Sequence, residues 1–206
     1  IKLTGIPIRK NLIKMNKKDA RKMLNLNSNK KTIFILGGSQ GSVCFNNYFY
    51  NELDFFINNN FQIIWQCGFN NFKYYNNKIN NKNILFKDFF EDISIPFSAS
   101  DIVVSRSGAM ALNEMAFLEK AMILIPFPSS AANHQYYNAK YFLMNKAAVM
   151  VEENQIKEKL NKAIIDLVND SDKIKIIGKN ASKLIINNAL DNIIYEIRIL
   201  EKGLKK

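Results

Sequence analysis

The chain is poor in the residues that build metal sites and disulfide frameworks. Its 206 residues include one histidine and two cysteines, Cys44 and Cys67, which lie far apart. This spacing matches neither a zinc-ligand pattern nor the paired cysteines of a secreted, disulfide-bonded fold. We therefore expect both cysteines to be buried, small apolar residues in a reducing cytoplasm.

Long apolar runs are also missing. No stretch approaches the roughly 20 apolar residues that cross a bilayer, and no signal-peptide pattern is visible. The sequence starts at Ile1 and runs directly into Thr4-Gly-Ile-Pro-Ile-Arg9. We expect the chain to be the second part of a longer protein.

Arginine is scarce although the chain is strongly basic. The formal net charge is +11, yet arginine occurs only at positions 9, 21, 106 and 198. Lysine and asparagine are abundant throughout, which is typical of drift toward AT-rich codons. We expect no nucleic-acid partner, because no stacking or arginine-fork motif accompanies the charge. An anionic membrane surface is a better partner for these lysines.

Short apolar runs alternate with helical patterns along the whole chain. Continuous apolar strands, each followed by a helix, predict a parallel sheet covered on both faces. We expect one Rossmann-like, doubly wound α/β domain over residues 1–206, with ligands beyond the carboxyl ends of its strands. The predicted strands are 32–36, 61–66, 83–86, 101–104, 121–125 and 147–151. The predicted helices are 42–57, 72–78, 91–97, 108–118, 133–146 and 155–169, with one or two more in 172–204.

The most informative motif is Ser105-Arg-Ser-Gly-Ala-Met-Ala-Leu-Asn-Glu114. It follows an apolar strand and opens a helix with small residues. A helix N-terminus offers free backbone N–H groups and positive potential, which suit a diphosphate. Glu114 lies two turns inside the helix, where a carboxylate could hold a ribose diol.

A second strand–glycine–helix junction spans 33–42 and contains Gly37-Gly-Ser-Gln-Gly41. Its glycine spacing differs from the dinucleotide fingerprint. The following strand ends in Trp65-Gln-Cys-Gly68, without the acidic residue that would bind the ribose of a dinucleotide. An NAD enzyme is therefore disfavoured. A tight turn without a ligand is the alternative to a phosphate site, but two such junctions together favour a nucleotide diphosphate.

Other polar residues leave their roles open. Arg106 could pair with phosphate or brace its turn against a carboxylate. The turn at Phe90 could meet a base edge or simply supply core aromatics. His134 and Gln135 are expected in the first turn of a helix capped by Asn133, where they could reach sugar hydroxyls. No Asp-x-Asp motif at a strand end and no His/Asp cluster points to a metal.

Taken in order, five segments resemble the MurG family of N-acetylglucosamine transferases, which make lipid II. They are Thr4–Arg9, Gly37–Gly41, Phe90-Glu-Asp-Ile93, Ser105–Ala109 with Glu114, and Asn133-His-Gln-Tyr-Tyr-Asn-Ala139. The resemblance runs from Leu3 to the end of the chain. It corresponds to the C-terminal, donor-binding half of that family.

The resemblance implies one half of a two-Rossmann (GT-B) transferase that uses UDP-N-acetylglucosamine, without a cofactor, and inverts the anomeric carbon. It assigns the diphosphate or nearby groups to Arg9 and Ser39, the uracil to the backbone of Phe90, and the ribose to Glu114. It assigns the sugar to Gln135, with His134 beside it. The helix N-terminus that would cradle the diphosphate consists of Gly108, Ala109, Met110, Ala111, Leu112 and Asn113.

The same resemblance places lipid I, the general base and the glycine-rich acceptor loop in an N-terminal domain that this chain lacks. It implies a peripheral protein on the cytoplasmic face of the bacterial inner membrane. His134 stands where a second glutamine can occur, and Met110 and Ala111 stand where a hydroxyl residue is common. The alternatives are another UDP-sugar lipid glycosyltransferase or a non-catalytic nucleotide-sugar-binding subunit.

Overall fold

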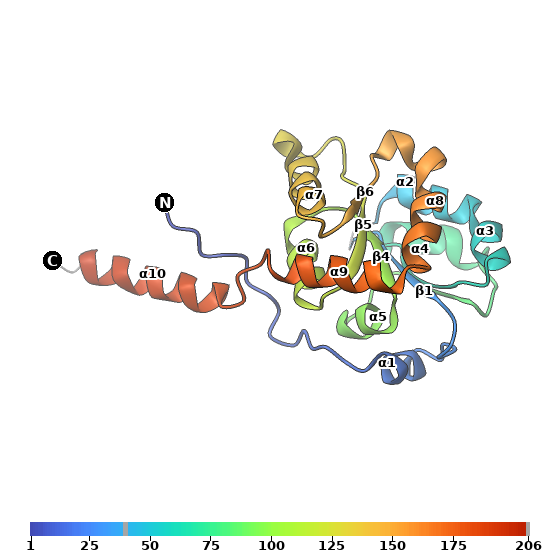
Figure 1. Cartoon of the computed structure of the whole chain (residues 1–206), viewed down its shortest axis with the longest axis horizontal. Helices are drawn as coiled ribbons and strands as arrows, with labels where there is room; N and C mark the ends of the chain where they lie inside the picture. Colours follow the sequence, from blue (N-terminus) through green and yellow to red (C-terminus); the bar gives the residue numbers. More distant parts are fainter. Residues whose placement is uncertain (39–40, 205–206) are drawn as a thin grey trace.

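The computed structural model describes residues 1–38 and 41–204, which form an α/β domain around one parallel sheet (Figure 1). The strand order is β3-β2-β1-β4-β5-β6, and every neighbouring pair is parallel. The strands are β1 (Thr32–Leu36), β2 (Gln62–Gln66), β3 (Ile84–Lys87), β4 (Ile102–Ser105), β5 (Ala121–Leu124) and β6 (Val149–Met150). The sequence predicted all six of these strands.

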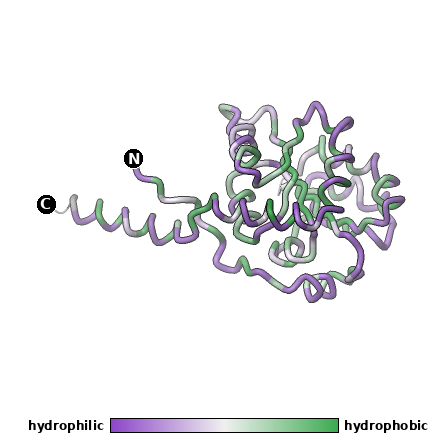
Figure 2. Tube along the Cα trace, viewed as in Figure 1, coloured by the Kyte–Doolittle hydropathy of each residue, from purple (hydrophilic) through white to green (hydrophobic). Residues whose placement is uncertain are grey.

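Helices cover both faces of the sheet, as expected for a doubly wound fold. Alternate side chains of β1 show the division, since Ile33 and Ile35 belong to one apolar core and Phe34 and Leu36 to the other. The first core is closed by α2 (Val43–Asn51), α3 (Leu53–Asn58), α4 (Phe69–Asn76) and α8 (Ile156–Val168). The second is closed by α1 (Lys17–Met23), α5 (Ser94–Ala99), α6 (Ala109–Phe117) and α7 (His134–Met144). Figure 2 shows the apolar residues concentrated in the strands, with polar residues outside.

The helix α1 was not predicted, and Asp101 explains how it is held to the sheet. Asp101 accepts hydrogen bonds from Thr32 N–H at 2.7 Å, from Arg21 at 2.8 Å and from Lys17 at 2.6 Å. Burial opposes ionisation of this carboxyl, but these donors hold its pKa below the usual value. Asp101 therefore ties α1 to the amino ends of β1 and β4.

Two further expectations were wrong. The predicted helix 42–57 is interrupted at Glu52, which is both the C-cap of α2 and the N-cap of α3. Cys44 is exposed near the start of α2, while Cys67 is buried as expected. Burial raises the pKa of the Cys67 thiol to about 12.

The last two helices of the chain differ in how they contact the domain. α9 (Ser171–Ser182) packs beside β5 and α6, whereas α10 (Ala189–Leu204) extends away from the domain near the N-terminal segment (Figure 1). Within the described ranges 1–38 and 41–204, none of the helices combines the length and apolarity needed to cross a membrane.

Candidate functional site

A cavity of about 250 Å³ lies at the carboxyl ends of the central strands. This edge of a parallel sheet is the expected ligand site in a doubly wound fold. Residues from five separate segments line the cavity. They are Arg9, then Leu36 and Gly38, then Gln66, then Phe89, Phe90 and Ile93, and finally Ser105, Arg106, Gly108, Met110, Ala111 and Glu114.

Glu114 supplies the only carboxylate among the described residues that line this cavity. Its side chain is 6% exposed, and its Oε1 atom lies 2.5 Å from Nε of Arg9. Despite this ion pair, Oε1 has no hydrogen-bond partner of acceptable geometry within the described residues. A buried carboxylate oxygen without a hydrogen bond is costly, so this atom is suited to accept one from a ligand hydroxyl.

The N-terminus of α6 is open toward the same cavity. Gly108 is its N-cap residue, and no side chain among the described residues caps the first turn. A β-carbon added to Gly108 would meet no described atom within 4 Å. The first N–H groups of a helix lack intrahelical partners, so this end offers donors and positive potential to an anion.

Arg106 braces the turn that precedes α6. It forms an ion pair with Glu153 and donates to Ser42 Oγ at 2.9 Å. Its guanidinium also lies over the rings of Phe45 and Phe127, at 4.6 and 5.3 Å from their centroids. Arg106 therefore holds its turn in place by pairing with a carboxylate, which is one of the two roles that the sequence left open. It also borders the cavity.

The turn after β3 reaches the cavity through Phe90. The Phe90 ring is buried, and its backbone N–H donates to Oε1 of Gln66 at 3.1 Å. The ring packs edge-on against Phe34, with 6.0 Å between the centroids. Phe90 is thus a core aromatic, which is one of the two roles considered for it, and it also borders the cavity.

His134 and Gln135 do not line the cavity of Glu114. The His134 ring is exposed, with Nδ1 2.8 Å from the Ala131 carbonyl oxygen. Gln135 Oε1 accepts from Phe127 N–H at 3.1 Å. Asn133 is the N-cap residue of α7 but has a φ of 53° and forms no side-chain cap, so the capping expectation was wrong.

Some of the remaining predicted residues line the cavity and others do not. Met110 and Ala111 line the cavity, whereas Leu112 is buried in the core. Ala109 and Asn113 do not line it, and Asn113 folds back to donate to the Ala109 carbonyl at 2.8 Å. Ser39 lies outside the described residues.

Gln66, Phe89 and Ile93 also line the cavity but were not predicted from the sequence. Gln66 carried a usable signal, because it is a polar residue at the carboxyl end of an otherwise apolar strand. Phe89 and Ile93 carried none, since buried aromatic and aliphatic residues have the same pattern in any core.

Comparison with known proteins identifies the family. Residues 32–193 match the model of the glycosyltransferase family 28 C-terminal domain. The chain belongs to this family. The match begins at β1 and ends inside α10, so it includes every strand and all but one of the cavity-lining segments.

Curated relatives of this glycosyltransferase domain are about twice its length. A protein of Flavobacterium psychrophilum is 36% identical over 197 residues, which are 95% of this chain and 54% of the relative. A protein of Bacteroides thetaiotaomicron is 34% identical and also covers 95% of this chain and 54% of its own length. Both are named UDP-N-acetylglucosamine--N-acetylmuramyl-(pentapeptide) pyrophosphoryl-undecaprenol N-acetylglucosamine transferase. The chain thus spans about half of the relatives it matches.

Solved structures confirm the fold. MurG of Acinetobacter baumannii superposes with a TM-score of 0.74 at 20% identity, covering 93% of this chain and 55% of that one. WaaG, a glycosyltransferase of lipopolysaccharide biosynthesis, gives 0.64 at 14% identity, covering 87% of this chain and 50% of that one. The domain therefore has the fold of one half of a GT-B glycosyltransferase, as the sequence predicted.

Proposed function

We propose that this chain is the donor-binding half of an inverting glycosyltransferase, which moves N-acetylglucosamine from UDP-N-acetylglucosamine to the muramoyl 4-hydroxyl of lipid I and forms lipid II. The names of the relatives support the reaction. The observation that carries the proposal is the cavity that brings together Arg9, Phe90, Gly108 and Glu114 from separate segments. A volume of about 250 Å³ is below the usual range of about 300–1,000 Å³ for ligand pockets, so the cavity holds the nucleoside part of the donor.

In this proposal, Glu114 accepts hydrogen bonds from the ribose hydroxyls. Its Oε1 atom is buried and has no hydrogen-bond partner among the described residues. Arg9, next to that oxygen, keeps the carboxylate in place and is 41% exposed, so its guanidinium also remains open to the donor. Phe90 supplies the apolar wall for the base.

The diphosphate binds at the N-terminus of α6, which begins with Gly108 and Ala109. As the bond between the anomeric carbon and the diphosphate breaks, negative charge grows on the leaving UDP. Preorganised N–H groups and the helix dipole stabilise that charge more in the transition state than in the ground state. No metal or cofactor is needed for this role. Ser39, which lies outside the described residues, is proposed as a further phosphate contact.

The sugar and the acceptor meet beyond this cavity. We assign the sugar to Gln135, with His134 beside it, because both follow the loop after β5 and Gln135 is joined to the diphosphate turn. Ser107 Oγ donates to the Gln135 carbonyl at 2.7 Å. The base that deprotonates the 4-hydroxyl, and the site for lipid I, are proposed to lie in the half of the relatives that this chain does not match.

We propose that the reaction takes place at the cytoplasmic face of the inner membrane, where a lipid tail would anchor the acceptor. The net charge of +11 supports peripheral attraction to anionic lipids there.

A transfer assay tests the proposed function. This chain is joined to the N-terminal half of the Flavobacterium psychrophilum relative, and transfer of radiolabelled sugar from UDP-N-acetylglucosamine into the lipid I fraction is measured. We expect transfer by the fusion, none by the chain alone, and a large loss in the fusion with Glu114→Ala. Faster transfer from UDP-galactose would support another lipid glycosyltransferase. Donor binding without transfer by the fusion would support a nucleotide-sugar-binding subunit.

A further inference from the structure

A second cavity, of about 290 Å³, lies at the amino ends of β4 and β5, whereas the cavity that contains Glu114 lies at the carboxyl ends. Four segments of the chain line this second cavity. Among the described lining residues are two carboxylates, Asp101 and Glu119, and five lysines, Lys14, Lys17, Lys120, Lys175 and Lys179. Positive charge therefore exceeds negative charge in this lysine cavity, which has no part in the proposed function.

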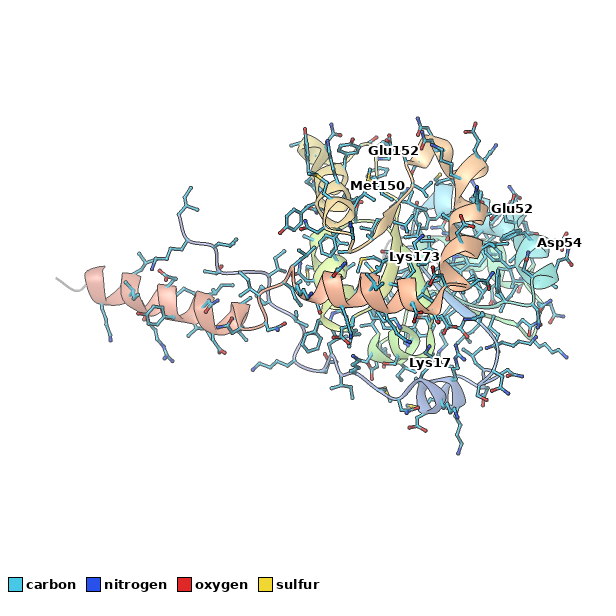
Figure 3. The ribbon with its side chains drawn as sticks, viewed as in Figure 1. Lys17, Glu52, Asp54, Met150, Glu152 and Lys173 are labelled. Atoms are coloured by element: carbon cyan, nitrogen blue, oxygen red, sulfur yellow. The ribbon has the colours of Figure 1, made fainter. Side chains whose placement is uncertain are left out.

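Both carboxylates of the lysine cavity are already paired. Asp101 accepts from Arg21 at 2.8 Å and from Lys17 of α1 at 2.6 Å (Figure 3). Glu119 forms an ion pair with Lys14. Neither carboxylate is therefore left to balance the charge of the other lysines.

Lys120 lies beside Asp101 but forms no ion pair among the described residues. The two residues directly precede β5 and β4, and the pairing of Ala121 with Ile102 puts them in register. The Nζ atom of Lys120 donates instead to the carbonyl oxygen of Ser100 at 2.6 Å, and its side chain is partly buried. A carbonyl oxygen carries no net charge, so the described part of the chain supplies this ammonium group with no counter-ion.

The surroundings of Lys120 disfavour its charged form. Burial lowers the pKa of its amine to about 7. The positive charges of Lys17, Arg21 and Lys14 also lower this pKa, while the negative charge of Asp101 opposes them. The other charged residues that border the cavity are Glu119, Lys175 and Lys179. A ligand that brings negative charge to this amine would favour its protonated form and offset the repulsion among the lysines.

Helix α9 supplies two further lysines at the edge of the cavity. A β-carbon added to Gly178 would lie 2.1 Å from the carbonyl oxygen of Glu119, so the backbone of α9 packs directly against the turn before β5. This contact brings Lys175 and Lys179, one helical turn apart, to the cavity. Lys175 pairs only with the exposed Asp172, which is a weak interaction, and Lys179 forms no ion pair among the described residues.

We propose that the lysine cavity binds a phosphate group, with Lys120 as the donor inside it and Lys175 and Lys179 at its edge. A phosphate monoester carries about −1.5 to −2 charges at pH 7 and several acceptor oxygens, which suits ammonium groups that converge from different segments. The volume of about 290 Å³ lies just below the usual range of about 300–1,000 Å³ for ligand pockets, so it fits the phosphate end of a larger molecule. This inference does not rest on the proposed function.

Nuclear magnetic resonance of the chain labelled with ¹³C at the lysine ε-carbons tests the inference at Lys120 itself. The Lys120 signal is identified by its loss in Lys120→Arg. Sulfate is the probe, because its own charge does not change in the pH range of the titration. We expect the midpoint of the Lys120 titration to move from about pH 7 to about pH 8 or higher when sulfate binds. An unchanged midpoint in about 10 mM sulfate would overturn the inference.

Calorimetric titration with inorganic phosphate at pH 7 tests the other lysines. Excess UDP is present, so that phosphate does not enter the cavity of Glu114. We expect Lys120→Met to weaken phosphate binding at least about tenfold and Lys179→Met about threefold. Lys173→Met is the matched control, because Lys173 is an exposed lysine of the same helix that does not line the cavity (Figure 3). Equal affinity in the unmodified chain and all three variants would mean that phosphate binds elsewhere, and the inference would be wrong.

Sedimentation with vesicles distinguishes a lipid headgroup from a soluble phosphate compound as the source of the phosphate. The vesicles consist of phosphatidylcholine, alone or mixed with phosphatidic acid, whose headgroup is a phosphate monoester. Sedimentation with phosphatidic acid that is lost in Lys120→Met and Lys179→Met, but kept in Lys173→Met, would identify a lipid headgroup. Binding of inorganic phosphate without such sedimentation would identify a soluble ligand. A chain that binds neither inorganic phosphate nor phosphatidic acid would overturn the inference, whether or not it binds UDP.

Discussion

The Nε atom of Arg9 lies 2.5 Å from Oε1 of Glu114, and this contact joins the segment before α1 to the helix α6. The contact fixes the position of the carboxylate while its buried oxygen remains without a hydrogen bond. A group that is held in place but not satisfied loses little freedom when a ligand arrives. The proposed role of Glu114 follows from this combination.

Replacing Glu114 by Ala should weaken UDP much more than 2′,3′-dideoxy-UDP, because the lost hydrogen bonds are to the ribose diol. Losing a pair of charge-assisted hydrogen bonds should lower the affinity for UDP roughly ten- to hundredfold. Calorimetry with both ligands measures the difference. Glu158→Ala is the control, because it removes the same negative charge from the exposed face of α8. Equal losses for the two ligands would assign Glu114 a structural role.

UDP binding should not depend on Mg²⁺. Glu114 is the only carboxylate among the described residues of the cavity, and the α6 N-terminus supplies the positive potential that a metal would otherwise give. Titrations in EDTA and in excess Mg²⁺ should give the same affinity. A collapse of affinity in EDTA would contradict the site described here.

Arg106 and Glu153 should be energetically coupled. Both side chains are largely buried, at 14% and 21% exposed, and Arg106 also holds Ser42 and two backbone carbonyls. We expect Arg106→Ala to lower the free energy of unfolding by about 3 kcal/mol, because it leaves a buried carboxylate unpaired. In a double-mutant cycle with Glu153→Gln, the coupling should be about 1–3 kcal/mol.

The exposed pair Lys175 and Asp172 serves as the control for this cycle and should show no measurable coupling. Simple additivity of the Arg106 and Glu153 variants would mean that the ion pair does not brace the turn. Urea denaturation of each variant supplies the free energies.

Asp101 should make stability depend on pH in the acid range. Its pKa in the folded chain is lowered, so its contribution is present above the unfolded value of about 3.9 and is lost as pH falls through the lower, folded value. Asp101→Asn should lower the free energy of unfolding by about 3 kcal/mol at neutral pH, since it leaves Arg21 buried without its carboxylate. The deficit should shrink below about pH 4.

Asp166→Asn, on the exposed face of α8, is the control and should leave the pH profile unchanged. Urea denaturation at a series of pH values measures both variants. A deficit for Asp101→Asn that is the same at low and neutral pH would contradict the assigned role of this carboxylate.

The strands and most helices were predictable because buried parallel strands are continuous apolar runs with helices between them. The segment of α1 was not, since only Ala20 and Arg21 are buried in it, and its stability comes from the distant Asp101. The break at Glu52 also escaped prediction, because the apolar pattern continues from α2 into α3. Local patterns do not encode such long-range contacts.

For the site, the sequence predicted that Arg9, Phe90, Gly108 and Glu114 belong together, and the structure places all four around one cavity. It did not predict that Arg9 would pair with Glu114 or that Gln66 would engage the Phe90 N–H. Both contacts join residues that are far apart in the sequence and that only the folded chain brings together.

Calorimetric titration of the purified chain with UDP, CDP and ADP tests the central claim most directly. We expect that UDP binds, that UDP-N-acetylglucosamine binds better than UDP-galactose, and that CDP and ADP bind at least about tenfold more weakly than UDP. No binding of UDP, or equal binding of the three diphosphates, would contradict the assignment of this cavity as a uridine-diphosphate sugar site.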